Sequence, residues 1–491
     1  MSGKQRVVVV GNGMVGHHFV EQLTQLKQHG DELEITVLSG EDRLAYDRVH
    51  LSEFFSGKTA SDLALTTADI YGDWHVNFFT NAKVENIDRQ QQFVTTQQGN
   101  RFYYDKLILA TGSFPFVPPI PGKDRDHCLV YRTINDLEAI KRSASQSKVG
   151  VVIGGGLLGL EAANALKKLG LQTHVVEFAP QLMGVQVDQA GGRLLKKKIE
   201  QLGVNVHTSM ATEQIVEGHQ CRYKMCFKGG HELETDMILF SAGIRPYDNL
   251  GREFGLDIGE RGGIVINNHC QTSDRNIYAI GECALWSNFI FGLVAPGYTM
   301  AKVAAKHIIF NNEVDAFTGA DMSTKLKLMG VEVGSIGDAH ARATGAKSYI
   351  FDDQINGIYK KIVVNQSGDR LLGAVLVGDT SDYDSLLQRY LNNLALVEPA
   401  ESLIMPLAGS LAEIDPVDLP DDAIICVCNK VTKLTIQNSI LSGCTDLAKV
   451  KSSTKACTGC GSCEQMVKSI IDSNNMLVTI TEPEQLSAPA V

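Results

Sequence analysis

Two glycine-rich turns, each set between a short apolar strand and a helix, limit the possible folds of this chain more than any other feature. The first, GNGMVG at 11–16, follows RVVVV and precedes HHFVEQLTQL. The second, GGGLLG at 154–159, follows VGVVI and precedes LEAANALKKLG. In this context the motif G-x-G-x-x-G is typical of a dinucleotide-binding βα turn, whose helix N-terminus faces a pyrophosphate. Two such units predict a doubly wound α/β fold with two nucleotide-binding lobes.

Each glycine of the motif has its own physical task. The first permits the tight turn, the second lets the backbone approach the pyrophosphate, and the third lets the helix pack closely on the strand. Two dinucleotide sites in one chain indicate one bound flavin and one exchanging nicotinamide. The predicted contacts are Gly11, Gly13 and Gly16 for FAD, and Gly154, Gly156 and Gly159 for NAD.

An acidic residue at the end of the second strand of such a unit binds the ribose hydroxyls. Glu177 ends the run LQTHVVE, and no arginine follows in EFAPQLM to hold a 2′-phosphate. This pattern favours NADH over NADPH. In the first unit Gly40 occupies the equivalent position and Glu41 follows, so either the Glu41 carboxylate or the backbone would contact the ribose.

The overall composition is that of a globular protein with several domains. The chain has 491 residues and a net charge of −11, so broad binding to nucleic acid or to anionic membranes is not expected. No apolar run is long enough to cross a bilayer, and the sequence enters a strand so early that we expect no signal peptide. We therefore expect a cytoplasmic protein whose clustered cysteines serve metal or redox chemistry.

Cysteines concentrate near the C-terminus, as C-x-C at Cys426 and Cys428 and as CTGCGSC at Cys457, Cys460 and Cys463. A C-x-C pair followed by C-x₂-C supplies four thiolates, which either zinc or a [2Fe–2S] cluster can use. The segment RLAYDRVHLSEFF at 43–55 contains no cysteine. No thiol there can accept electrons from a flavin, and this favours the iron–sulfur interpretation.

Several segments resemble those of flavoproteins with two dinucleotide-binding domains. LILATGS at 107–113 and NIYAIGECA at 276–284 resemble their further flavin-contact segments, and FSAGIRPYDNL at 240–250 resembles the return from the nicotinamide lobe. AYDRVHLS resembles a segment of the flavoproteins that reduce one-electron protein carriers. The resemblance implies flavin contacts at Arg43, Arg48, Thr111, Gly112 and Glu282, and a nicotinamide-nucleotide contact at Gly243. Glu161, on the helix after the second turn, is predicted to lie near the nicotinamide as a catalytic residue.

The segment 424–478 resembles the small helical [2Fe–2S] domain of the bacterioferritin-associated ferredoxin type. Cys428 and Cys460 are separated by 31 residues, a spacing that fits this type. The resemblance implies that Cys426, Cys428, Cys460 and Cys463 are the cluster ligands and that Cys457 is a bystander.

The whole chain resembles the N-terminal half of the NAD(P)H-dependent assimilatory nitrite reductase large subunit, through GNGMVGHHF, RLAYDRVHLS and TKACTGCGSC. This resemblance implies an NADH-oxidising electron-input unit that passes electrons from NADH to FAD and to [2Fe–2S], and so feeds nitrite or nitrate reduction. The expected partner is a downstream domain or subunit with sirohaem and [4Fe–4S], since the nitrite-reducing half is not expected in this sequence. A homo-oligomer is left open. The alternatives are a stand-alone NADH-dependent reductase of a rubredoxin-like or nitrate-reductase carrier, and an iron-handling or redox-sensing binding module.

The expected domain order follows from these motifs. An FAD-binding domain in two parts, 1–120 and 247–316, encloses an NAD(H)-binding domain at 121–246. A small α/β interface domain at 317–405 comes next, and a proline-rich and acidic linker at 406–423 leads to the [2Fe–2S] module at 424–478.

Overall fold

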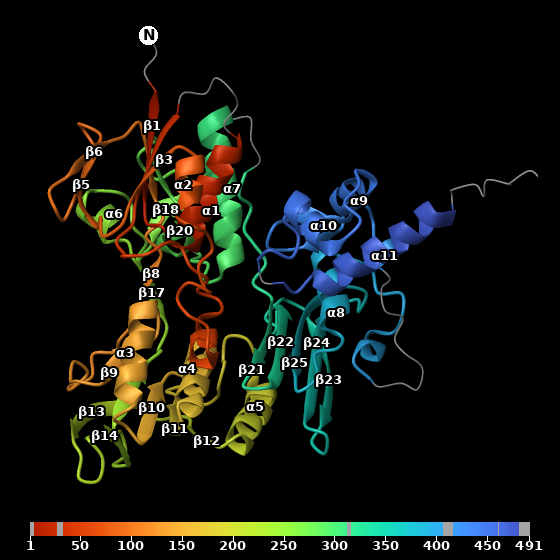
Figure 1. The fold of residues 1–491 in the computed structure, drawn as a ribbon. Coiled ribbons are helices and arrows are strands. Elements are labelled where there is room, and N and C mark those ends of the chain that lie inside the picture. Colours follow the sequence, from red (N-terminus) through yellow and green to blue (C-terminus); the bar gives the residue numbers. More distant parts are fainter. Residues whose placement is uncertain (1–3, 27–32, 312–315, 406–415, 460, 481–491) are drawn as a thin grey trace, which may run out of the picture.

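The computed structural model describes residues 4–26, 33–311, 316–405, 416–459 and 461–480 (Figure 1). The first lobe contains a five-stranded parallel sheet in the order β19-β7-β1-β2-β3. The central strand carries the run Val7–Val10, which is fully buried, as expected for a parallel sheet covered on both faces. Its strands are β1 (Gln5–Val10), β2 (Leu33–Leu38), β3 (Val76–Phe79), β7 (Lys106–Leu109) and β19 (Ile277–Ala279).

Two helices pack against each other beside this sheet, α1 (Met14–Leu26) and α7 (Val294–Phe310) (Figure 1). They come from opposite ends of the first lobe's sequence. The lobe also contains the antiparallel sheet β4-β5-β6 and the pair β18-β20. The bounds of these smaller elements are α2 (Asp69–Asp73), β4 (Val84–Asp88), β5 (Phe93–Thr96), β6 (Arg101–Tyr103), α6 (Asn249–Glu253), β18 (Ile264–Ile266) and β20 (Ala284–Trp286).

The second lobe repeats the topology of the first. Its parallel sheet has the order β12-β11-β10-β16-β9, again with the strand before the glycine turn in the middle. An antiparallel sheet, β13-β14-β15, is attached to it. The bounds are β9 (Cys128–Val130), α3 (Ile134–Ala144), β10 (Val149–Ile153), α4 (Leu157–Lys168), β11 (Gln172–Val176), α5 (Gln189–Gln201), β12 (Val204–His207), β13 (Thr212–Glu217), β14 (Tyr223–Phe227), β15 (Glu232–Thr235) and β16 (Met237–Phe240).

The chain crosses between the two lobes twice, and the crossing strands pair with each other. β8 (Ser113–Pro115) leaves the first lobe and β17 (Ile244–Pro246) returns to it, in antiparallel register. This arrangement brings the ends of both parallel sheets to the junction of the lobes, where ligands bind in folds of this type.

The third unit is an antiparallel sheet in the order β21-β22-β25-β24-β23 with one helix packed on it. Lys361 of this sheet reaches the second lobe, where its ammonium lies 3.1 Å from the Asp188 carboxylate. The elements are β21 (Thr324–Leu328), β22 (Val331–Gly337), β23 (Lys347–Asp353), β24 (Ile358–Val364), β25 (Leu371–Val377) and α8 (Tyr383–Leu391).

The cysteine module is small and mostly helical, as expected. It contains β26 (Ile424–Cys426), β27 (Val431–Thr432), α9 (Lys433–Leu441), α10 (Leu447–Thr454) and α11 (Glu464–Ile480). Leu419 and Ala423 are buried in its core, although the sequence assigns them to the linker. Residues 406–415 of that linker lie outside the described residues. Within the described ranges, no helix is both long and apolar enough to span a bilayer.

Candidate flavin, nicotinamide and iron–sulfur sites

The first glycine turn has the geometry of a phosphate cradle. Gly11 has φ +103°, and a Cβ on it would lie 2.3 Å from the Ala110 carbonyl oxygen. A Cβ on Gly16 would lie 2.2 Å from the Gly11 carbonyl oxygen, so helix and turn touch directly. A Cβ on Gly13 would meet no protein atom within 4 Å. The chain's own packing therefore requires the first and third glycines, while the second faces open space that a pyrophosphate fits.

The second turn repeats this division. Gly154 has φ +119°, and a Cβ there would lie 2.1 Å from the Ser241 carbonyl oxygen. A Cβ on Gly159 would lie 2.0 Å from the Gly154 carbonyl oxygen, whereas one on Gly156 would meet nothing within 4 Å. Both turns thus fit a dinucleotide at their second glycine.

Glu177 lies directly at the second turn. One carboxylate oxygen accepts a hydrogen bond from the Gly155 N–H at 2.5 Å, and the other accepts one from the Ala179 N–H at 2.7 Å. The carboxylate is therefore held beside the turn in the position from which it can receive ribose hydroxyls. That role remains a prediction.

Replacing Glu177 by alanine is expected to weaken NADH binding and to spare NADPH. The substitution removes an acceptor for two hydroxyls and also removes the repulsion of a 2′-phosphate. Loss of a charged hydrogen-bond partner costs about 1.5 kcal/mol or more, roughly tenfold in affinity. The ratio of kcat/KM for NADH and NADPH measures the effect, and an unchanged ratio would mean that Glu177 only ends its strand.

The predicted flavin contacts Thr111 and Gly112 lie where the chain leaves the first lobe. The Thr111 hydroxyl donates to the Tyr247 carbonyl at 2.7 Å, and the Gly112 carbonyl accepts from the Tyr247 N–H at 2.9 Å. Gly243 precedes the returning strand with φ +104°, and its carbonyl accepts from the Phe116 N–H at 2.9 Å. These residues therefore join the two crossings that connect the lobes.

Glu282 pairs with an arginine that the sequence analysis missed. Its carboxylate accepts a hydrogen bond from the Ser113 hydroxyl at 2.6 Å and forms an ion pair with Arg132. Arg132 also donates to Ser113 at 2.7 Å, and its buried Nε has no hydrogen-bond partner among the described residues. Arg132 precedes the Thr133 cap of α3. No sequence motif singles out Arg132, because its partner Glu282 lies 150 positions away in the chain.

Glu41 and the two predicted arginines lie near each other, but the contacts differ. Glu41 is paired with Arg48 and accepts from the Tyr46 hydroxyl at 2.8 Å. The Arg48 guanidinium lies 4.7 Å from the centre of the Tyr46 ring. Arg43 instead donates to Asn135 at 2.6 Å and to Asp42 at 3.0 Å. Glu41 is thus already engaged by a cation, and its contact with the ribose remains a prediction.

Glu161 lies on α4, two residues after the last glycine of the second turn. Burial raises its pKa to about 7, and the nearby His50 offsets part of that increase. The buried Tyr131 hydroxyl interacts electrostatically with Glu161 and has no hydrogen-bond partner among the described residues. The Tyr131 hydroxyl therefore has unused hydrogen-bonding capacity beside Glu161 and close to the second turn, where a nicotinamide carboxamide could use it.

Glu161→Gln is expected to make the stability of the unliganded protein less dependent on pH. Because the native pKa lies above the ordinary 4.5, the folded chain retains a proton that the unfolded chain releases between about pH 4.5 and 7. Wild-type stability therefore falls by about 3 kcal/mol across this window, and the glutamine variant should not show this fall. Denaturation midpoints at pH 5 and pH 8 measure it, with the exposed Glu253→Gln as control. Equal pH dependence in wild type and Glu161→Gln would contradict the assignment.

Three of the four predicted cluster ligands lie in the core of the cysteine module. Cys426, Cys428 and Cys463 are all buried there. The thiols of Cys426 and Cys463 interact. A Cβ on Gly459 would lie 2.8 Å from the Cys428 Cβ and 3.1 Å from its sulfur, so a larger residue at 459 would press on the Cys428 side chain. Cys460 lies outside the described residues. A buried, thiol-rich core of this kind fits an iron–sulfur cluster.

Cys457, which the resemblance makes a bystander, nevertheless lies in contact with one of the predicted ligands. Its sulfur is 3.4 Å from the Cys463 sulfur. Without Cys460, the described residues contain no group of three or more His, Cys, Asp or Glu side chains arranged to hold a metal ion. The choice of Cys426, Cys428, Cys460 and Cys463 as ligands therefore remains a prediction.

Comparison with known protein families decides the class of the two lobes. The pyridine nucleotide-disulphide oxidoreductase family matches residues 5–307. The chain belongs to this family. The rubredoxin NAD+ reductase C-terminal domain matches residues 323–393, and the BFD-like [2Fe–2S] binding domain matches residues 424–473. As a pyridine nucleotide-disulphide oxidoreductase with a BFD-like domain, the chain is an NAD(P)H oxidoreductase that uses FAD and a [2Fe–2S] cluster. The predicted fold class and cofactors are confirmed.

Relatives of this oxidoreductase support the predicted resemblance along the whole chain. It is 52% identical over 96% of its length to the nitrite reductase (NADH) large subunit of Escherichia coli, of which it covers 56%. It is 35% identical over 95% of its length to an assimilatory nitrate reductase electron transfer subunit of Bacillus subtilis, covering 59% of it. The chain thus spans somewhat more than half of each of these relatives. A NAD-dependent persulfide reductase from A. fulgidus has a similar structure, with TM-score 0.70, 25% identity and 80% of each chain covered.

Proposed function

We propose that this chain is the electron-input unit of an NADH-dependent nitrite reductase. In this proposal it oxidises NADH and delivers electrons one at a time toward a centre with sirohaem and [4Fe–4S] on a further domain or a partner subunit. The 52% identity to a nitrite reductase large subunit supports the choice of nitrite. No disulfide joins two cysteines among the described residues, which fits the cytoplasmic location that we also propose.

One observation carries the electron-transfer part of this proposal. The flavin lobe has no cysteine in the segment 43–55, yet a module of buried cysteines contacts the same lobe through an ion pair between Lys455 and Glu21. Two-electron input and one-electron output are therefore combined in one chain. When bound, FAD accepts a hydride from a nicotinamide, and a [2Fe–2S] cluster accepts single electrons.

In this proposal the residues of the chain bind and orient the nicotinamide and the flavin, and they take no part in the electron transfer as reactants. Gly156 leaves room for the pyrophosphate of the nicotinamide nucleotide, and Glu177 receives the adenosine ribose hydroxyls. Glu161, whose pKa is raised to about 7 by burial, holds the carboxamide and so presents one face of the nicotinamide to the flavin. Arg132 and Glu282 close the junction of the lobes on the flavin side.

A second candidate function rests on one relative. The similarity to an electron transfer subunit of assimilatory nitrate reductase supports a nitrate-reducing partner in place of a nitrite-reducing one. The two candidates share the same input chemistry and differ in the partner. The purified, cofactor-loaded chain should oxidise NADH steadily with a one-electron acceptor such as cytochrome c. Absence of that turnover would contradict both candidates, and reconstitution with each partner separates them.

A further inference from the structure

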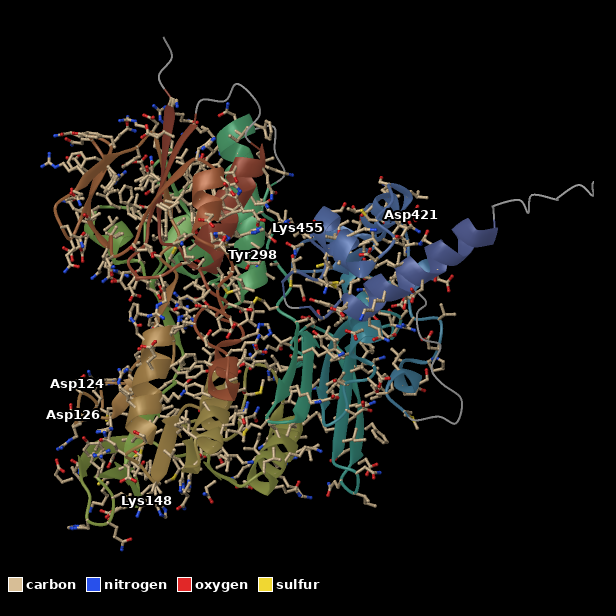
Figure 2. All side chains as sticks on the ribbon, in the orientation of Figure 1. Asp124, Asp126, Lys148, Tyr298, Asp421 and Lys455 are labelled. Atoms are coloured by element: carbon tan, nitrogen blue, oxygen red, sulfur yellow. The ribbon has the colours of Figure 1, made fainter. Side chains whose placement is uncertain are left out.

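The two helices that begin at the flavin site also face the cysteine module. This surface, the α1/α7 face, is formed by His18 and Glu21 of α1 and by Tyr298 and Lys302 of α7. Tyr298 and Lys455 of the module are labelled in Figure 2, where the first lobe and the module meet. The rings of His18 and Tyr298 lie 4.3 Å apart, and His18 Nδ1 lies 3.2 Å from the Glu21 carboxylate. These contacts join α1 and α7 to each other on the side that the module contacts.

Two polar bridges join the module to this face. The Lys455 ammonium lies 3.3 Å from the Glu21 carboxylate. The Lys302 ammonium donates to the Asn429 backbone carbonyl at 3.3 Å and to its side-chain oxygen at 3.2 Å. Ala295 of α7 packs against the apolar core of the module. The contact therefore includes charge, hydrogen bonding and apolar packing.

Asn429 connects this contact to both cysteine-bearing loops. It follows Cys428 directly, is buried, and donates through its side chain to the Lys455 carbonyl at 2.7 Å and to the Thr458 hydroxyl at 3.1 Å. Lys302 thus holds the residue that ties the C-x-C loop to the CTGCGSC loop. Tyr298 and Lys302 also lie within electrostatic range of Cys428 and Cys426, respectively.

The first turns of α1 and α7 contact the predicted flavin-binding segments. A Cβ on Gly297, the neighbour of Tyr298, would lie 3.4 Å from the Cα of Gly281 and 2.5 Å from Val15. Gly281 begins the short segment that carries Glu282, and Gly16 of α1 touches the turn at Gly11. The α1/α7 face therefore connects the predicted flavin contacts to the cysteine loops through directly packed residues.

We propose that the α1/α7 face is the docking surface that holds the [2Fe–2S] module in its electron-receiving position. Lys302 and Glu21 act as positioning residues through Asn429 and Lys455. This inference rests on the proposed function, because it assumes that the cluster receives its electrons from the flavin. Each NADH yields two electrons and one proton as a hydride. The cluster takes one electron at a time, so two successive transfers across this face complete one oxidation.

A charge-reversal cycle on the holoprotein tests the docking surface. Glu21→Lys and Lys455→Glu each place like charges in contact, and the double variant restores an opposite pair. Flavin reduction by NADH and the subsequent cluster reduction are followed by stopped-flow absorbance, and deuterium uptake of α1 and α7 is measured separately. Each single variant should slow cluster reduction about tenfold or more and raise deuterium uptake, while the double variant should recover most of both.

The control is Lys449→Glu, since Lys449 lies on α10 and pairs with Asp446 of the same module at 3.2 Å. This variant should leave both rates and the uptake unchanged. Single reversals with the wild-type rate of cluster reduction, or a double variant as slow as the slower single one, would overturn the proposal. If a charge reversal lowers the iron content, the Lys302→Met variant is measured instead, by cluster reduction and deuterium uptake. A wild-type rate of cluster reduction in Lys302→Met would count against the proposal. A wild-type cluster that NADH never reduces would instead refute the proposed function.

Discussion

Replacing Cys463 by serine should remove almost all iron from the protein and leave its flavin chemistry intact. Cys463 is buried in the module core, in contact with the thiols of Cys426 and Cys457. The flavin cradle at Gly13 is built by a different lobe. The variant should therefore lose the broad iron–sulfur absorption, retain FAD, and still reduce that FAD with NADH. Iron analysis and the visible spectrum of the purified variant measure both effects.

Cys444→Ser is the matched control. Cys444 is only partly buried and packs at the edge of the same core, so its loss should leave iron content near the wild-type value. The predicted ligand set further requires that Cys460→Ser behaves like Cys463→Ser and that Cys457→Ser does not. Equal iron loss in the Cys457 and Cys460 variants would contradict that set, and normal iron in Cys463→Ser would contradict the site itself.

Gly156→Ala should abolish most nicotinamide binding without destabilising the fold. The added methyl group meets no protein atom within 4 Å, and the backbone there is ordinary and extended, so the apoprotein tolerates it. A bound pyrophosphate would meet it directly and lose charged hydrogen bonds to the turn. We expect a loss of about 3 kcal/mol, roughly a hundredfold in Kd for NADH.

Two further glycines make this test specific. Gly159→Ala places its methyl group 2.0 Å from the Gly154 carbonyl oxygen and should lower the denaturation midpoint itself. Gly72→Ala, at an exposed helical position with nothing within 4 Å, should change neither property. If Gly156→Ala bound NADH as tightly as wild type, the second turn would not hold the dinucleotide.

The parts of this protein that local sequence determines could be predicted. The runs around 5–38 and 149–177 form the expected strands and helices, because a short run rich in β-branched residues that ends at a glycine turn favours a buried parallel strand. The separate tasks of Gly13 and Gly16 follow from motif spacing alone. The ligand choice among the cysteines could not be settled, because spacing does not show which sulfurs face inward.

The contacts that join distant segments could not be predicted. Arg132 and Glu282 are 150 positions apart and Lys302 and Asn429 are 127 apart, so no periodicity or motif links them. The sequence left open whether the Glu41 carboxylate or the backbone contacts the ribose, and it did not predict the ion pair between Glu41 and Arg48. Such pairings depend on how the lobes and the module pack, and single-sequence patterns carry no information on that packing.

The central claim is that electrons from NADH reach the iron–sulfur module through the flavin lobe of this one chain. An anaerobic titration of the cofactor-loaded protein with NADH, followed by flavin absorbance and by electron paramagnetic resonance, tests it most directly. We expect the flavin band to bleach and a reduced [2Fe–2S] signal to grow with added NADH. The same titration of Cys463→Ser should bleach the flavin without that signal. A wild-type protein whose flavin is fully reduced while its cluster stays oxidised would contradict the account.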